Sequence, residues 1–162
     1  SNNHKFVTDK LPFNFMWIGF IILSLPNAKI INCVRNPMDN CLSIYKNYFI
    51  KKGNQYAYDL NELGKFYKIY NNMMTFWESV FPNRIYNISY EALVRNQNFE
   101  TKKLLKNCGL HFDKNCINYQ DNKRNILTAS SFQVRQPIYN SSIDYWKNYK
   151  HDLEELKKIL YQ

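Results

Sequence analysis

The chain has 162 residues, enough for one compact domain, and its share of hydrophobic residues (45%) and aromatic residues (17%) allows a substantial core. This composition, with 22% charged residues, argues against a disordered chain. The formal net charge of +9 favours anionic partners such as nucleic acid, an anionic membrane or a phosphate-rich ligand, without choosing among them. No apolar run reaches the roughly 18 residues that a membrane-spanning helix needs.

The predicted elements alternate between strands and helices along the chain. In order, they are the end of a strand at 5–9, a helix at about 15–25 capped by Asn14, a buried strand at 29–34, helices at about 38–50 and 59–80, a strand at 84–89, helices from 90 and at 97–108, a polar loop at 120–142 and a helix at about 151–161. This alternation predicts a single α/β domain over 1–162 with a parallel sheet.

An arginine and a serine flank a predicted strand–turn–helix junction. Arg35 leaves the carboxyl end of the strand at 29–34, and Ser43 lies in the next helix. Because ligands of open α/β sheets bind at the carboxyl ends of strands, the two side chains can grip one phosphate from two sides. The spacing permits a second interpretation equally well, in which Arg35 pairs with Asp39 to brace the turn and Ser43 only fills a helix position.

Five sequence blocks, taken together and in this order, resemble the PAPS-dependent sulfotransferase family. They are D-K-L-P at 9–12, L-P-N-A-K at 25–29, R-N-P-M-D-N-C-L-S at 35–43, S-Y-E-A-L at 89–93 and a late block made of T-A-S-S-F-Q-V-R-Q-P at 128–137 followed by Y-N-S-S-I-D-Y-W-K-N-Y at 139–149. The layout is similar to that of tyrosylprotein sulfotransferases, and more so to that of bacterial sulfotransferase domains that follow tetratricopeptide repeats. The resemblance implies a P-loop-like three-layer fold that transfers a sulfuryl group from 3′-phosphoadenosine 5′-phosphosulfate (PAPS) to a hydroxyl of a protein tyrosine or a glycan.

The resemblance also implies roles for individual residues. Arg35 and Ser43 would hold the 3′-phosphate of PAPS, and Tyr90 would contact the adenine or its surroundings. Lys10 matches the family's catalytic lysine, although without the resemblance it reads as an ordinary surface lysine. Ser130 would lie near the transferred group. Four residues of the same late loop would complete the nucleotide site: Ser131, Gln133, Val134 and Arg135.

Two positions depart from the family pattern. Tyr145 stands before Trp146 where a basic residue is expected, and Lys147, which follows Trp146, would face another way on a helix. Asn47, next to Lys46, stands where tyrosylprotein enzymes carry a further arginine. We therefore expect a 3′-phosphate site that is weaker or differently built.

The family's first strand, its glycine-containing loop for the 5′-phosphosulfate and its general base find no match here. We therefore expect a partial domain that depends on an upstream part of the same polypeptide and is inactive by itself. The alternative function is a non-catalytic binding module on a degenerate sulfotransferase fold. No nucleic-acid-binding signature and no metal-ligand spacing of cysteines and histidines occurs, so neither partner is expected. The expected compartment is the cytoplasm, or the Golgi lumen for a eukaryotic tyrosylprotein-type enzyme.

Overall fold

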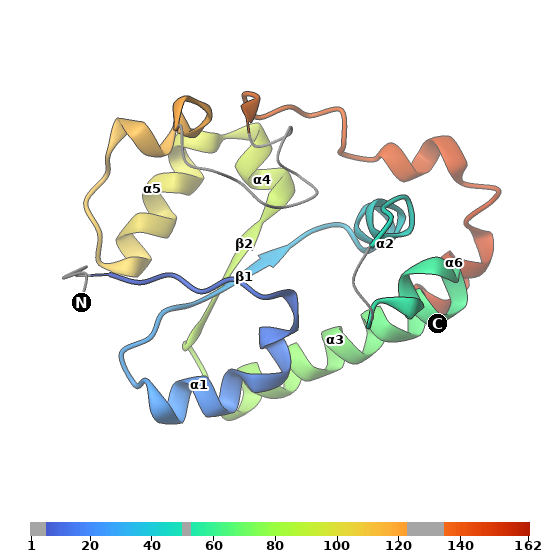
Figure 1. Cartoon of the computed structure of the whole chain (residues 1–162), viewed down its shortest axis with the longest axis horizontal. Coiled ribbons are helices and arrows are strands. Elements are labelled where there is room, and N and C mark those ends of the chain that lie inside the picture. Colours follow the sequence, from blue (N-terminus) through green and yellow to red (C-terminus); the bar gives the residue numbers. More distant parts are fainter. Residues whose placement is uncertain (1–5, 50–52, 123–134) are drawn as a thin grey trace.

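The structure, a computed structural model, describes residues 6–49, 53–122 and 135–162 (Figure 1). Its strands are β1 (Ile30–Val34) and β2 (Ile85–Ser89). Its α-helices are α1 (Ile18–Ser24), α2 (Pro37–Tyr45), α3 (Leu60–Val80), α4 (Tyr90–Arg95), α5 (Gln97–Cys108) and α6 (Glu154–Tyr161). Short 3₁₀ helices lie at Pro12–Trp17, Gln55–Tyr58, Lys114–Cys116, Tyr119–Asp121 and Tyr145–Tyr149. Within these ranges no helix combines the length and the apolar character that crossing a membrane requires.

The two strands pair in parallel, which confirms the expected α/β class with a parallel sheet. The register runs from Ile30 opposite Ile85 to Val34 opposite Ser89. Both strands therefore end at the same edge of the sheet, and the residues that follow them are neighbours in space. This register places Arg35 beside Tyr90, which lies 55 positions later in the chain.

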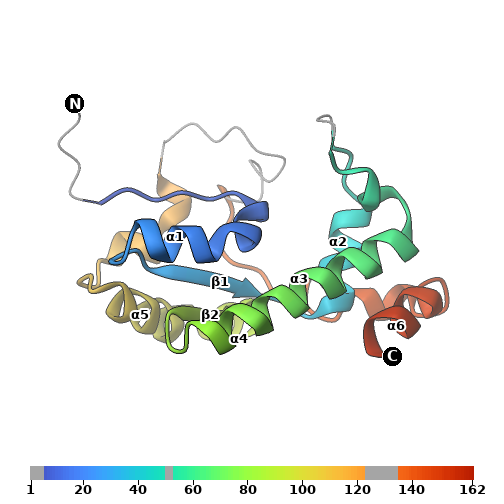
Figure 2. The same ribbon diagram turned by 90° about the horizontal axis from the view of Figure 1, so that it is seen from below.

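Helices lie on both sides of the strands. Figure 1 shows β1 and β2 running between α4 and α5 on one side and α1 and α3 on the other, and Figure 2 shows α1 lying along β1. One hydrophobic cluster joins α1 to α3 and to the start of both strands; its buried residues are Phe15, Ile18, Ile22 and Met74. This cluster fixes the position of β1, and thereby the direction in which Arg35 leaves the sheet.

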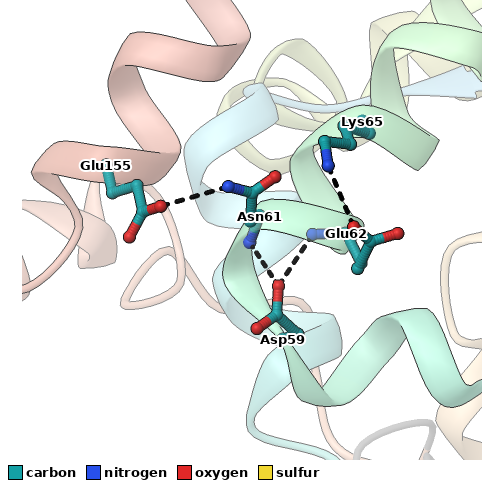
Figure 3. A network of polar contacts seen from close by, with 5 residues as sticks. All are labelled: Asp59, Asn61, Glu62, Lys65 and Glu155. Atoms are coloured by element: carbon teal, nitrogen blue, oxygen red, sulfur yellow. Dashed lines mark hydrogen bonds and ion pairs between the residues drawn. The ribbon is translucent and has the colours of Figure 1, made fainter.

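A second hydrophobic cluster joins α2, α3 and α6 through Met38, Cys41, Leu42, Leu63, Leu153 and Leu156. The approach of α3 to α6 depends on Gly64, since a Cβ atom there would lie 2.9 Å from Cγ2 of Ile159. A polar network secures the start of α3 (Figure 3): Asp59 accepts hydrogen bonds from the backbone N–H groups of Asn61 and Glu62, as an N-cap should. Asn61 also donates to Glu155 at 3.1 Å, tying α3 to α6.

Several predicted elements differ from the observed ones at their ends. Residues 6–9 form no strand, so that prediction is wrong for them, and the next helix starts as 3₁₀ at Pro12, whose fixed φ suits a first turn. Asn14 does not cap it but donates to Asp9 at 2.6 Å. Helix α2 ends at Tyr45 rather than near 50, and α6 starts at Glu154 rather than 151. The internal order of strands and helices is as predicted.

Candidate functional site

The turn between β1 and α2 is fixed first by its own sequence. Asn36 caps α2, because its Oδ1 atom accepts hydrogen bonds from the backbone N–H groups of Met38 at 3.0 Å and Asp39 at 3.2 Å. Pro37 opens the helix at a position where a missing N–H costs nothing. The turn therefore presents Arg35 at the carboxyl end of β1 with little local freedom.

The guanidinium group of Arg35 is held from two other parts of the chain. Its Nη2 atom donates to the carbonyl oxygen of Ser142 at 2.7 Å, and its Cζ atom lies 4.8 Å from the centroid of the Tyr90 ring. Its Nε atom is buried and has no hydrogen-bond partner within the described residues. A buried donor without an acceptor is costly, so this nitrogen is a natural contact for an anionic ligand.

Glu91 links the ends of the two strands. Its Oε1 atom accepts the backbone N–H of Asn36 at 2.7 Å, and its Oε2 atom accepts the hydroxyl of Ser89 at 2.9 Å. Partial burial raises the pKa of Glu91, but the hydrogen bonds from Asn36, its own backbone and Ser89, together with the charge of Arg35, outweigh burial and lower that pKa below its usual value. The ionised carboxylate therefore clamps the Arg35 turn to the start of α4.

Asp39 does not play the part that the second interpretation of the motif gave it. This side chain is 2% exposed, and its two oxygens accept the backbone N–H groups of Asp144 at 2.7 Å and Trp146 at 2.9 Å. The salt bridges found among the described residues do not include a pair between Asp39 and Arg35. Asp39 instead anchors the segment around 142–146 against α2, which places Ser142 within reach of Arg35.

These contacts leave a cavity of about 400 Å³ beside the end of β1, which we call the strand-end cavity. Arg35 and Ser43 both line it, so the structure brings together the two residues whose spacing predicted a shared site. Its other polar walls come from Asp39, Lys46, Asn47, Ser141, Ser142 and Tyr145. Cationic and hydroxyl donors around one cavity suit an anion with several oxygen atoms.

The remaining predicted site residues lie elsewhere or cannot be placed. Tyr90 contacts Arg35, and burial raises its pKa despite the opposing charge of the guanidinium. Lys10 is exposed and does not line the strand-end cavity, and Arg135 is also exposed. The predicted contacts from Ser130, Ser131, Gln133 and Val134 lie outside the described residues.

Sequence reasoning assigned no individual role to three polar residues that line the cavity: Lys46, Ser141 and Ser142. Lys46 had a usable signal, since it follows Ser43 by three positions and so falls on the same face of α2. The two serines lie in the stretch at 139–149 that resembles part of the late cofactor loop, and they reach the cavity because Asp39 binds the backbone that follows them.

Comparison with known proteins decides the family. A family model described as "Sulfotransferase family" matches residues 1–114. The chain belongs to the sulfotransferase family. The match contains Lys10, Arg35, Ser43 and Tyr90, whereas the cavity wall from Ser141 to Tyr145 lies beyond it. Membership indicates a transferase at the level of the family.

One relative is similar over nearly the whole chain. It is an uncharacterized protein of Aquifex aeolicus (strain VF5), 35% identical over 161 residues. These residues are 98% of this chain but 21% of the relative, so the chain spans about a fifth of the length of that relative. Within the described ranges, no group of three or more His, Cys, Asp or Glu side chains is arranged to hold a metal ion.

Proposed function

We propose that the strand-end cavity binds the 3′-phosphate of PAPS and that the chain takes part in sulfuryl transfer from PAPS to a hydroxyl group. One observation carries the proposal: Arg35 and Ser43, from the two sides of the β1–α2 turn, line one cavity at the carboxyl end of a parallel strand. The resemblance of the motif at 35–43 to the phosphate motif of sulfotransferases supports the same assignment.

The residues present fit such a ligand. A phosphate ester can accept a hydrogen bond from the buried Nε atom of Arg35, which has no partner among the described residues, and another from the Ser43 hydroxyl. Tyr90 lies beside Arg35, where its ring can contact the adenine of the same nucleotide. The late loop at 130–135 would add further nucleotide contacts, as the resemblance implies.

PAPS supplies the activated sulfuryl group. In the transfer, a new S–O bond forms to the acceptor oxygen while the S–O bond to the bridging phosphate oxygen breaks, and 3′,5′-ADP leaves with the negative charge. The role proposed for Lys10 is to stabilise that developing charge, a gain larger in the transition state than in the ground state. The acceptor's proton passes to a general base, which the resemblance places in an upstream part of the polypeptide. A protein tyrosine or a glycan is the proposed acceptor.

The test combines binding with transfer in the intact protein. Calorimetric titration should show tighter binding of 3′,5′-ADP than of 5′-AMP, which lacks the 3′-phosphate. Arg35→Ala should weaken 3′,5′-ADP binding by about 10²-fold or more while leaving 5′-AMP binding nearly unchanged, because a charge-assisted contact to the 3′-phosphate is lost.

A matched control is Arg95→Ala, which removes an exposed arginine at the end of α4 and should leave both affinities unchanged. Equal affinities of the unchanged protein for the two nucleotides would overturn the proposal. Nucleotide discrimination without transfer from radiolabelled PAPS to tyrosine-containing peptides or glycans would instead identify a binding module on the sulfotransferase fold.

A further inference from the structure

Lys46 is a cationic side chain that lines the strand-end cavity, and the sequence analysis gave it no role in ligand binding. We infer that Lys46 is the second phosphate-binding cation of this cavity and acts together with Arg35. The inference rests on the proposed function, and it names a residue that determines specificity for the 3′-phosphate. Three observations support it: the position of Lys46, the charge balance of the cavity, and the location of Asn47 and Tyr145, the two departures from the family pattern, in the same cavity wall.

The position of Lys46 follows from the geometry of α2. Lys46 is the C-cap residue of this helix and stands three positions after Ser43, so both side chains project from one face. Ser43, Lys46 and Asn47 all line the strand-end cavity. Arg35 lines the same cavity from the other end of the helix, at the turn that precedes its N-terminus. A ligand in the cavity is therefore within reach of a cation at each end of α2.

The charge balance shows why one cation is not enough. Arg35 and Asp39 both line the cavity, so their formal charges cancel. Asp39 is fixed there by the backbone N–H groups of Asp144 and Trp146 and cannot turn away. A phosphate monoester carries close to two negative charges near neutral pH. The Lys46 ammonium restores a net positive charge to the cavity walls and opposes the repulsion between Asp39 and the phosphate.

Lys46 packs against an aromatic ring of the cavity wall. Its Nζ atom lies 4.3 Å from the centroid of the Tyr145 ring, and the Tyr145 hydroxyl lies 3.3 Å from that of Tyr149. The salt bridges found within the described residues do not include Lys46. A cation–π contact at an exposed position is weaker than a charge-assisted hydrogen bond to a phosphate oxygen, so Lys46 can exchange the ring for the phosphate.

Lys46 lies close to both positions at which the sequence departs from the family pattern. Tyr145 and Asn47, which stand where the family carries basic residues, both line the cavity together with Lys46. Lys147, the other lysine near these positions, forms an ion pair with Asp144 at 2.8 Å and does not line the cavity. The charge lost at two positions is thus supplied by Lys46 rather than by Lys147.

The test compares Lys46→Gln, Lys46→Arg and the matched control Lys147→Gln in the intact protein, each checked by thermal unfolding. Titration with 3′,5′-ADP should show affinity reduced about tenfold in Lys46→Gln, within about threefold of the original in Lys46→Arg, and unchanged in Lys147→Gln. Affinity for 5′-AMP should be the same in all of them. Salt should weaken 3′,5′-ADP binding less in Lys46→Gln than in the unchanged protein, because one charge contact is missing.

Three results would overturn the inference, and the first two separate it from the proposed function. If the unchanged protein prefers 3′,5′-ADP over 5′-AMP and Lys46→Gln keeps that preference in full, Lys46 does not contact the 3′-phosphate and the proposed function stands. If the unchanged protein shows no preference, the proposed function fails and the inference fails with it. An equal loss for both nucleotides in Lys46→Gln would reveal a general structural role and would also overturn the inference.

Discussion

Arg35 and Lys10 are two cations proposed for one reaction, and the structure surrounds them in opposite ways. Arg35 follows a paired strand and is held through Ser142, Tyr90 and the clamp at Glu91. Lys10 lies in the exposed stretch at 6–11, in which Asp9 and Leu11 accept short-range hydrogen bonds from Asn14. A cation that binds a ligand before reaction must be fixed in advance, whereas a lysine that acts on the leaving group can be positioned by the bound nucleotide itself.

The largest expected effect separates these two regions. Lys10→Ala should lower the turnover of sulfuryl transfer by about 10²-fold or more, the scale for losing one electrostatic partner of the transition state. Affinity for 3′,5′-ADP should change much less, because Lys10 lies outside the strand-end cavity. Steady-state kinetics and calorimetry on the same preparation measure both quantities. Lys29→Ala, which removes an exposed lysine just before β1, is the control, and near-normal turnover of Lys10→Ala would show that Lys10 is not catalytic.

The next effect tests how the Arg35 region is supported. Asp39→Ala should lower the free energy of unfolding by about 2–4 kcal/mol, because it leaves the backbone N–H groups of Asp144 and Trp146 without their buried acceptor. Urea unfolding followed by tryptophan fluorescence measures this change. Asp152→Ala, at an exposed position, should stay within about 0.5 kcal/mol of the unchanged protein. A similarly small change for Asp39→Ala would mean that the 142–146 segment is not anchored through this carboxylate.

The smallest effect concerns the Glu91 clamp. Glu91→Gln keeps an acceptor for the Asn36 N–H but loses the charge, so the free energy of unfolding at pH 7 should fall by about 1 kcal/mol. The pKa of folded Glu91 lies below its usual value of 4.5. The carboxylate therefore contributes stability fully above that value, and the contribution is lost as the pH falls through the lowered folded pKa.

The pH dependence gives this third prediction its own check. The difference in unfolding free energy between the unchanged protein and Glu91→Gln, measured in urea from pH 7 downward, should shrink once the pH falls below about 4.5. A difference that stays constant through this range would show that the stabilising group at position 91 is not the ionised carboxylate.

Local sequence was enough to determine the order of elements and the first half of the site. The helix predicted at about 59–80 matches α3 (Leu60–Val80), which Asp59 caps in the structure, and the β1–α2 turn is set by Asn36 and Pro37. The helix end expected near 50 was placed too late, because nothing in the sequence between Tyr45 and Gly53 marks the earlier stop.

Tertiary structure decided how the strand-end cavity is closed. The bond from Arg35 to Ser142 spans 107 positions, and the bonds from Asp39 to Asp144 and Trp146 span 105 and 107. Contacts between residues so far apart in the chain leave no periodic signal in the sequence. They depend on how the parallel strand register and the hydrophobic cluster of α2, α3 and α6 position each segment. The sequence could therefore name Arg35 and Ser43, but only folding brought Lys46 and Tyr145 to the same cavity and so set its charge.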